Sequence, residues 1–362
     1  MRQLTPSSEA HIRPAGAITH AEIFQQPRLW PTTLNIVRQS GFVAEAFPGP
    51  VVVTGAGTSA YAAVAVAEAW RNAQGIPTTD LLLDPTPFYQ KEGLLISLAR
   101  SGDSPESVGV VEKVRRLFPA VKHLAITCNE NGKLANAPGV NAIVLDPRTN
   151  DRSLAMTSSF SNLVLAGLAL RHAGRLSSDL PAIADRAQSN LLEFDERAKA
   201  IASRPVSRIA ILASRPLFGA AREASLKILE MTAGKCVAIP ETFLGLRHGP
   251  MSFLRADTLV LCFLSTNPLF RRYEEDLVSE LKAKGLGYIA GIGPEDWPRN
   301  LFNDFIPASA PGLPDFLRTP FEIMFPQLLA YRLSLQAGLN PDNPSPDGVI
   351  TRVVKGVRIH EG

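Results

Sequence analysis

The chain has 362 residues, 45% of them apolar and 20% charged, a composition typical of a globular protein with two domains or one large one. The formal net charge of +3 and the lack of a long basic block count against a nucleic-acid partner. Three widely spaced cysteines, Cys128, Cys236 and Cys262, match no metal-binding pattern, and we interpret them as reduced core thiols in a cytoplasmic protein. The sequence starts without the apolar core of a signal peptide and has no apolar run of membrane-spanning length, so we expect neither a leader nor a membrane partner.

A helical arm is predicted at the start of the chain, over residues 1–35. From residue 50 onward, short apolar runs alternate with longer helical stretches, the pattern of an α/β fold whose parallel sheet is covered by helices on both faces. In this first half, strands are predicted at residues 51–53, 81–83, 94–98, 123–127 and 142–145. Helices are predicted at residues 60–73, 105–118 and 160–174, and a long polar helix starts around Pro181.

The second half of the chain repeats this plan. Strands are predicted at residues 208–212, 259–264 and 287–290, and an alanine-rich helix is predicted at 219–233. Each of these strands has a counterpart in the first half at a similar distance along the chain, 51 with 208, 94 with 259 and 124 with 287. Two copies of one α/β unit explain this regularity better than chance does, with the transition near residues 204–206.

Two turns in the first half carry polar groups where predicted strands end. Residues 100–107, Arg-Ser-Gly-Asp-Ser-Pro-Glu-Ser, place hydroxyl groups around a glycine and a proline where a helix can start. Residues 55–60, Gly-Ala-Gly-Thr-Ser-Ala, form a second turn of this kind. Turns that follow neighbouring parallel strands meet at one edge of a sheet, and helix N-termini with free amides suit a phosphate. The sequence therefore predicts a site for a small phosphorylated molecule.

The turn at residues 55–60 also matches the GxGxxA pattern of dinucleotide-binding proteins, with Asp80 or Asp84 as a candidate ribose ligand. A nicotinamide-dependent dehydrogenase is therefore an alternative hypothesis. The pattern is weak by itself, because any tight turn from strand to helix needs glycines. The second hydroxyl-bearing turn favours a monophosphate instead, so we expect no organic cofactor.

Two residues of the second half are candidates for proton transfer. Glu230 lies on the predicted helix at 219–233, three residues after Lys227, and its neighbours are mostly apolar. An ordinary surface ion pair explains this spacing as well as a poorly solvated carboxylate that acts as a general base. His248 lies in a loop between glycine and proline residues, where it is either a structural residue or a group that transfers protons near neutral pH.

A polar cluster precedes the predicted helix at 160–174. It comprises residues 150–153 and 156–159 and contains Asp151, Thr157 and Ser158. Side chains of these types commonly cap helix N-termini, and a contact with a substrate is the alternative.

Taken together, the chain resembles the sugar isomerase (SIS) superfamily in its tandem form, and within it the AgaS type of tagatose-6-phosphate ketose/aldose isomerase or galactosamine-6-phosphate deaminase. The matching stretches follow one another at residues 26–30, 54–60, 100–108, 126–129, 151–152, 155–159, 219–227, 229–235, 247–250 and 352–357. The resemblance implies two SIS domains, each a five-stranded, mostly parallel sheet flanked by helices in a flavodoxin-like three-layer sandwich. It divides the chain into the arm (1–35), a first domain with the phosphate-binding turns (36–195), a second domain with the catalytic helix and the histidine loop (196–345), and a tail over the active site (346–362).

The resemblance also implies roles for single residues. Glu230 would move a proton between C1 and C2 of the sugar, Lys227 would lie close to it, and His248 would come from a neighbouring subunit to open the sugar ring. The sugar and its phosphate would be held by Gly57, Thr58, Ser59, Arg100, Ser101, Ser104, Asp151, Thr157, Ser158 and Lys355.

We therefore predict an isomerase or deaminase that acts on a hexosamine or hexose 6-phosphate. It would form tagatose 6-phosphate and ammonia from galactosamine 6-phosphate, or interconvert an aldose and a ketose. It would need no metal or organic cofactor, bind neither nucleic acid nor membrane, and work as a homodimer or higher homo-oligomer. The alternative is a sugar-phosphate-binding regulator without activity, because SIS folds serve both roles. The presence of both Glu230 and His248 favours an enzyme.

Overall fold

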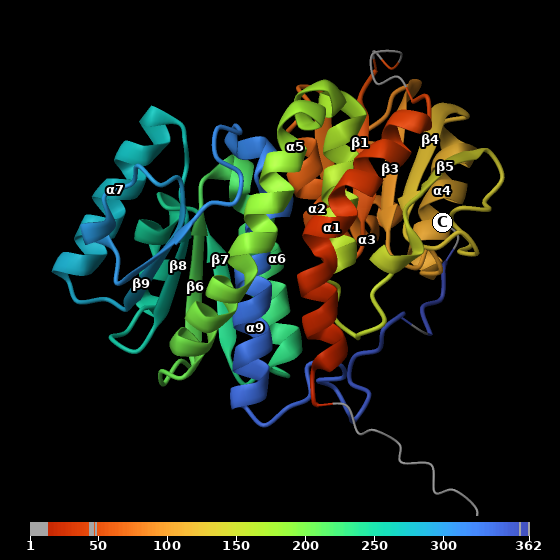
Figure 1. Cartoon of the computed structure of the whole chain (residues 1–362). Helices are drawn as coiled ribbons and strands as arrows, with labels where there is room; N and C mark the ends of the chain where they lie inside the picture. The colour runs from red at the N-terminus through yellow and green to blue at the C-terminus, as the bar shows by residue number, and fades with distance from the viewer. Residues whose placement is uncertain (1–13, 43–46, 48, 355, 361–362) are drawn as a thin grey trace, which may run out of the picture.

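Two five-stranded sheets stand on either side of a layer of helices (Figure 1). This computed structural model of the protein describes residues 14–42, 47, 49–354 and 356–360. All strand pairs in both sheets are parallel. The predicted fold class, two α/β units with five-stranded sheets flanked by helices, is confirmed.

The first sheet has the strand order β2-β1-β3-β4-β5. Its strands are β1 (Val51–Gly55), β2 (Ala73–Pro77), β3 (Glu92–Ala99), β4 (Ala120–Thr127) and β5 (Val140–Val144). Every residue of β1 and seven of the eight residues of β3 are buried, as expected for central strands that are covered on both faces. These two strands place the residues that follow them at one edge of the sheet.

The predicted strand at residues 81–83 is wrong. These residues belong to the short helix α3 (Thr78–Leu83), in which Leu81 is buried and Leu83 is 79% exposed. A run of three leucines with a single buried face suits a helical turn on the surface better than a central strand. The other helices of this half are α2 (Thr58–Ala67), which ends earlier than predicted because the chain turns back into β2, and α4 (Pro105–Leu117).

The second sheet has the strand order β10-β9-β8-β6-β7, which is the order of the first sheet read from the opposite edge. Its strands are β6 (Arg208–Ala213), β7 (Val237–Glu241), β8 (Leu259–Phe263), β9 (Tyr288–Gly293) and β10 (Asp304–Pro307). The predicted repeat is confirmed, because β6, β8 and β9 occupy the places of β1, β3 and β4. The two edge strands β7 and β10 were not predicted individually, since one is only partly buried and the other has four residues.

Six further helices surround these sheets. They are α1 (Ala17–Gln39), α5 (Ser158–Ala202), α6 (Phe218–Met231), α7 (Pro268–Ala283), α8 (Thr319–Glu322) and α9 (Met324–Gln336). Short 3-10 segments lie at Pro147–Thr149, Arg215–Leu217, Gly245–His248, Pro250–Phe253, Arg299–Leu301 and Asp315–Leu317. The helix α1 runs past residue 35, where the predicted arm ends, and residues 1–13 of that arm lie outside the described residues.

The helix α5 joins the two halves of the chain. Its 45 residues bend at His172, whose backbone leaves the helical region (φ −119°, ψ 24°), so the second helical segment starts there rather than at Pro181. The predicted boundary between residues 195 and 196 falls inside this helix, and the division into domains stays a prediction.

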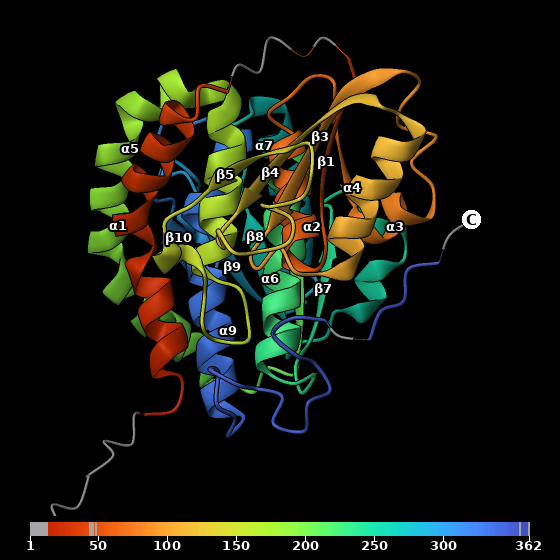
Figure 2. The same cartoon turned by 90° about the vertical axis from the view of Figure 1, so that its right-hand side faces the viewer.

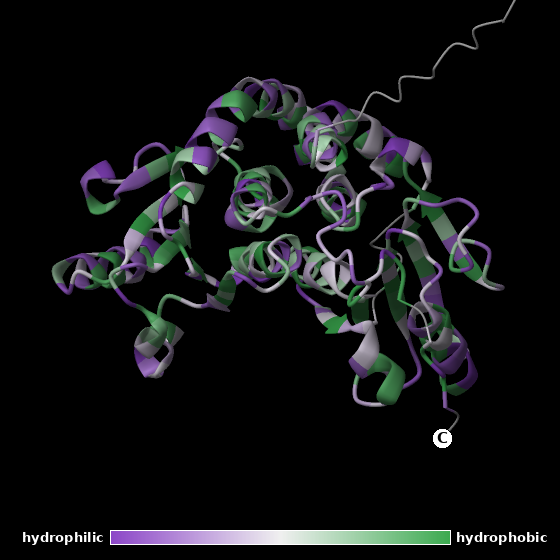
Figure 3. Ribbon diagram, turned by 90° about the horizontal axis from the view of Figure 1, so that it is seen from below, coloured by the Kyte–Doolittle hydropathy of each residue, from purple (hydrophilic) through white to green (hydrophobic). Residues whose placement is uncertain are grey.

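A continuous apolar core extends from the inner face of the first sheet, through the helix layer, to the inner face of the second sheet. Figure 3 shows that apolar residues are frequent along the strands of both sheets. Cys128, Cys236 and Cys262 are buried free thiols, as predicted. Within the described ranges, no helix combines the length and the apolar character needed to cross a membrane.

Candidate active site

A pocket opens at the carboxyl ends of β1 and β3, where the two polar turns lie side by side. Six of the predicted binding residues line it: Gly57, Thr58, Ser59, Arg100, Ser101 and Ser104. Glu230 reaches it from α6, and residues 350–354 of the C-terminal segment complete its wall. In Figure 2 this segment, drawn in blue, passes in front of α6 and runs toward α4. Both halves of the chain and its tail therefore meet at one pocket.

The first turn contributes the start of α2. A Cβ atom at Gly55 would lie 2.4 Å from the carbonyl carbon of Ser59, so only glycine lets α2 fold back so tightly after β1. Gly57 is the N-cap of α2 and provides no side chain that could cap the helix. The positive end of α2 is therefore left open toward the pocket, which suits an anionic ligand.

The second turn contributes the start of α4. Ser104 is the N-cap of this helix and Pro105 is its first residue, as the sequence predicted. The Ser104 hydroxyl donates to the Glu106 carboxylate and does not cap an amide of the first turn. Two open helix starts with hydroxyl groups beside them thus converge on the same pocket, an arrangement that can bind a phosphate.

The helix α6 packs closely against α2. A Cβ atom at Gly219 would lie 2.9 Å from the amide nitrogen of Ala65 and 3.0 Å from the carbonyl oxygen of Tyr61, both in α2, so this approach requires glycine. Two turns further along α6, the Nζ atom of Lys227 donates to the Thr58 hydroxyl at 2.9 Å. The close packing of these helices therefore links the second half of the chain to the phosphate turn of the first half.

Three charged residues share one face of α6. The Lys227 side chain is fully buried and forms an ion pair with Glu230, while the Glu223 carboxylate lies 3.6 Å from its Nζ atom. Burial opposes the charge on Lys227, but Glu223 and Glu230 together raise the pKa of this lysine above its ordinary value. Burial raises the pKa of Glu223 to about 8. Glu230 is the outermost of the three, with 23% of its side chain exposed, and it is the one that lines the pocket.

The Arg100 guanidinium donates hydrogen bonds to backbone carbonyl groups around the pocket. Its Nη1 atom donates to the carbonyl oxygen of Leu154 at 3.1 Å, and its Nη2 atom donates to the carbonyl oxygen of Arg352. Arg352 in turn donates from Nε to the carbonyl oxygen of Asp151 at 2.9 Å and from Nη2 to Asn150 Oδ1 at 2.7 Å. Burial lowers the pKa of Arg100. The two arginines tie together the turn after β3, the loop before α5 and the C-terminal segment.

Asp151, Thr157 and Ser158 do not line the pocket. All three are almost fully buried, and the Asp151 carboxylate accepts hydrogen bonds from the amides of Thr157 at 2.9 Å and Ser158 at 3.1 Å. This carboxylate caps the N-terminus of α5, which is the helix-cap alternative that the sequence left open. Leu154 and Met156, between these residues in the sequence, form the wall of the pocket instead.

His248 also lies outside the pocket of its own chain. It is exposed at the end of the 3-10 segment Gly245–His248, which follows β7. Lys355, the predicted tail lysine, lies outside the described residues. Among the residues that the structure describes, no group of three or more His, Cys, Asp or Glu side chains could hold a metal ion.

Two residues of the site were missed at the sequence level. Glu223 was overlooked although its position four residues before Lys227 is an ion-pair spacing. Arg352 was overlooked because no local pattern tells that a residue near the end of the chain lies beside the loop at 150–154. The resemblance implied a tail over the active site, but it pointed to Lys355 and not to Arg352 as the contact residue.

Comparison with known proteins gives relatives over almost the full length. The chain is 37% identical to an AgaS protein of Streptomyces coelicolor and 34% identical to the D-galactosamine-6-phosphate deaminase AgaS of Escherichia coli, with 98% of both chains covered in each case. The crystal structure of tagatose-6-phosphate ketose/aldose isomerase from Escherichia coli superposes with a TM-score of 0.85 at 32% identity, covering 96% of this chain and 97% of the other. No protein-family model matches the chain.

Proposed function

Because this chain belongs to the AgaS family of tandem SIS-domain proteins, we propose that it converts D-galactosamine 6-phosphate and water to tagatose 6-phosphate and ammonia. It is an enzyme of the sugar-phosphate isomerase and deaminase class, because its relatives at 34–37% identity are named as deaminases and the similar solved structure at 32% identity is named as an isomerase. One observation carries the proposal: the Glu230 carboxylate, held by the buried Lys227, stands at the edge of a pocket formed by two open helix starts.

The phosphate is proposed to bind between the starts of α2 and α4. Gly57, Thr58 and Ser59 contribute from one side, and Ser101 and Ser104 contribute from the other. The hydroxyl groups and the positive helix ends both favour a dianion there. Arg100 adds a positive charge close by while its guanidinium holds the C-terminal segment in place.

Glu230 is proposed to be the base that transfers the proton. It removes the proton from C2 of the open-chain aminosugar, which gives an enolamine, and it returns the proton to C1, which gives an imine at C2. Water then adds to C2, the bond between C2 and nitrogen breaks, and ammonia leaves with the ketose. With a hydroxyl group at C2, the same proton transfer interconverts an aldose and a ketose.

Lys227 and Glu223 are proposed to hold Glu230 in place for this step. Lys227 donates to both Thr58 and Glu230, so one ammonium group links the phosphate turn to the base. Glu223 lies behind this lysine with no exposed surface, and it adds a further acidic partner at 3.6 Å. A base that is fixed relative to the phosphate meets C1 and C2 in a constant geometry.

His248 is proposed to open the sugar ring in the site of a second copy of the chain. Its exposed position outside its own pocket fits this role. Three apolar side chains of the second half are also exposed, Leu229, Val237 and Leu244, with 46%, 48% and 49% of their surface accessible. A homodimer would cover them. We place the enzyme in the cytoplasm, where free thiols such as its three cysteines persist.

The proposal is tested by incubating the full chain with galactosamine 6-phosphate, glucosamine 6-phosphate and tagatose 6-phosphate. We expect equal amounts of ammonia and ketose from galactosamine 6-phosphate, and slower release from the gluco epimer. Interconversion of hexose phosphates without any ammonia would refute the deaminase and leave the isomerase. No change in any of the three sugars would refute the proposed reaction altogether.

A further inference from the structure

The second half of the chain contains its own copy of the phosphate turn. After β8, the sequence Ser265-Thr266-Asn267-Pro268 leads into α7, as Ser101 to Pro105 leads from β3 into α4. In both turns a serine follows the strand and precedes the N-cap residue, and a proline is the first residue of the helix. Because β8 occupies the place of β3 in its sheet, this second turn lies where an anion site would be expected.

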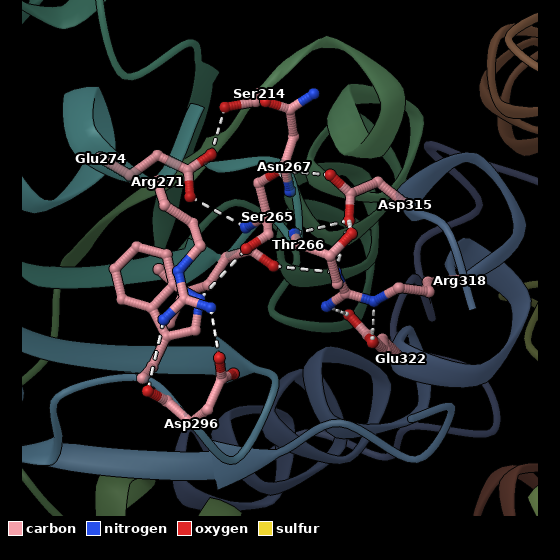
Figure 4. Close-up of polar contacts among 12 residues, drawn as sticks. Ser214, Ser265, Thr266, Asn267, Arg271, Glu274, Asp296, Asp315, Arg318 and Glu322 are labelled. Carbon is pink, nitrogen blue, oxygen red and sulfur yellow. Dashed lines mark hydrogen bonds and ion pairs between the residues drawn. The ribbon is translucent and has the colours of Figure 1, made fainter. Parts of the chain in front are cut away.

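A carboxylate of the same chain occupies that place. Asp315, in the 3-10 segment Asp315–Leu317, accepts hydrogen bonds at Oδ1 from the Thr266 amide at 2.8 Å and the Thr266 hydroxyl at 2.7 Å. Its Oδ2 atom accepts a hydrogen bond from the Ser265 hydroxyl, and Arg318 donates to Oδ1 at 2.8 Å (Figure 4). Two hydroxyls, one amide and one guanidinium are the donors that a phosphate commonly receives.

The remaining donors around this turn are also used internally. The Asn267 side chain accepts from the amides of Leu269 at 2.9 Å and Phe270 at 3.3 Å, so α7 is capped where α4 is open. The Glu274 carboxylate accepts from the Ser265 amide at 2.8 Å and from the Ser214 hydroxyl at the end of β6. Figure 4 shows these side chains converging from β6, β8, α7 and the 3-10 segment.

One buried guanidinium supplies the positive charge in this cluster. Arg318 is fully buried and forms ion pairs with Asp315 and with Glu322, whose Oε1 atom lies 2.7 Å from its Nε atom. Although burial acts against the charged form, Arg318 and the hydrogen bonds of Ser265 and Thr266 together lower the pKa of Asp315. Asp315 is therefore a charged carboxylate in a site of matching donors.

We propose that Asp315 is a built-in anionic ligand that fills the second strand-end site, so that each chain accepts one sugar phosphate, in its first half. The count of one sugar phosphate rests on the proposed function, whereas the occupied anion site does not. The second turn keeps the donors of a phosphate site and uses them to attach the segment before α8 to the end of β8.

The test removes the built-in carboxylate and offers a free one. Asp315→Ala in the full chain deletes a carboxylate but keeps the donors, so we expect the melting temperature to fall by about 10 °C. Formate, which matches the deleted group, should then raise it again in a saturable manner. Asp315→Asn keeps the space filled and should not respond to formate. Asp296→Ala removes a carboxylate that is 69% exposed nearby and reports the general effect of the salt.

The outcomes decide the inference. A formate response of Asp315→Ala no larger than that of Asp296→Ala, or an equal response of Asp315→Asn, would overturn it. If Asp315→Ala is unfolded in plain buffer, recovery of a cooperative transition in formate supports it, and no transition at any formate concentration contradicts it. Titration calorimetry with galactosamine 6-phosphate should give one site per wild-type chain, and two sites would overturn the inference. Complete lack of binding would refute the proposed function, and the formate response would still decide the role of Asp315.

Discussion

Replacement of Glu230 by glutamine separates the two interpretations that its sequence position allowed, an ion pair or a general base. Glutamine has the same shape, and its carbonyl oxygen can accept a hydrogen bond from Lys227 as the carboxylate does. It cannot take up a proton from a carbon atom at neutral pH. A residue that serves only packing and pairing would tolerate this change, whereas a base would not.

The structure gives the size of both effects. After the replacement, the fully buried Lys227 keeps the Thr58 hydroxyl at 2.9 Å and the Glu223 carboxylate at 3.6 Å. We therefore expect the unfolding free energy to fall by only about 1 kcal/mol, less than the roughly 3–5 kcal/mol that breaking a buried pair costs. A positioned base contributes about 10²–10⁴-fold to the rate, which corresponds to about 3–5 kcal/mol of transition-state stabilisation. Turnover should thus fall by at least a hundredfold in a protein that remains folded.

The assay measures ammonia release from galactosamine 6-phosphate, with urea unfolding and phosphate-induced thermal shift measured on the same samples. Glu68→Gln is a matched control, because Glu68 is 19% exposed, is paired with Arg215 at 2.9 Å, and lies outside the pocket. Phosphate should stabilise both variants as it stabilises the wild type. Turnover of Glu230→Gln within about threefold of the Glu68→Gln value would refute the assignment of Glu230 as the base.

Three further predictions follow from the site and from the second half. Arg352→Ala removes the hydrogen bonds that hold the C-terminal segment against the loop before α5, so KM should rise roughly tenfold with kcat little changed, while Arg358→Ala, on the same segment, should leave KM unchanged. If His248 serves a second copy, mixing inactive His248→Ala and Glu230→Gln chains should restore about a quarter of the wild-type activity, because half of the randomly mixed dimers hold one intact site out of two, and no recovery would contradict a shared site. Burial raises the pKa of Glu274 from 4.5 to about 7, so its contribution to stability is complete below pH 4.5 and is lost as the pH rises through 7. The unfolding free energy, measured in urea, should therefore decline between pH 5 and pH 8 by about 3 kcal/mol less in Glu274→Gln than in the wild type. An equal decline in both proteins would refute the raised pKa of Glu274.

The repeated α/β fold could be predicted from the sequence because its central strands are continuous apolar runs. Residues 51–55 and 92–99 are buried on both faces, and such runs stand out at any position in the chain. The edge strands β7 and β10 lack this signal, because every residue of β7 is at least partly exposed and β10 has only four residues. Residues Leu81 to Leu83 were wrongly predicted as a strand. An apolar run of three residues is too short to show the periodicity that distinguishes a helix from a strand.

The two turns of the pocket and Glu230 could be predicted from the sequence, and all of them line the pocket. The turns at residues 55–60 and 100–107 can be recognised in the sequence by their glycine, hydroxyl and proline residues, and both line the pocket. The same residue types at 151–158 belong to a helix cap, because Asp151 satisfies the amides that a ligand would otherwise meet. Composition alone does not tell these two uses apart. What decides is whether a carboxylate of the chain itself reaches the helix start.

The two corresponding turns, after β3 and after β8, differ in whether a carboxylate of the chain reaches them. In the first half the turn contains Gly102 at φ +68° and ends in Ser104, whose hydroxyl does not cap α4. In the second half the turn is one residue shorter, and Asn267 caps α7 while Asp315 takes the hydroxyl and amide donors. In the second half a carboxylate of the chain accepts from these donors, whereas in the first half we propose that a phosphate does so. Because the strand order is shared, the difference between the two turns lies in these few residues and in the segment that brings Asp315. In a repeated fold, one copy of a turn can therefore remain open for a ligand, while the other copy binds a carboxylate of the same chain and stabilises the fold.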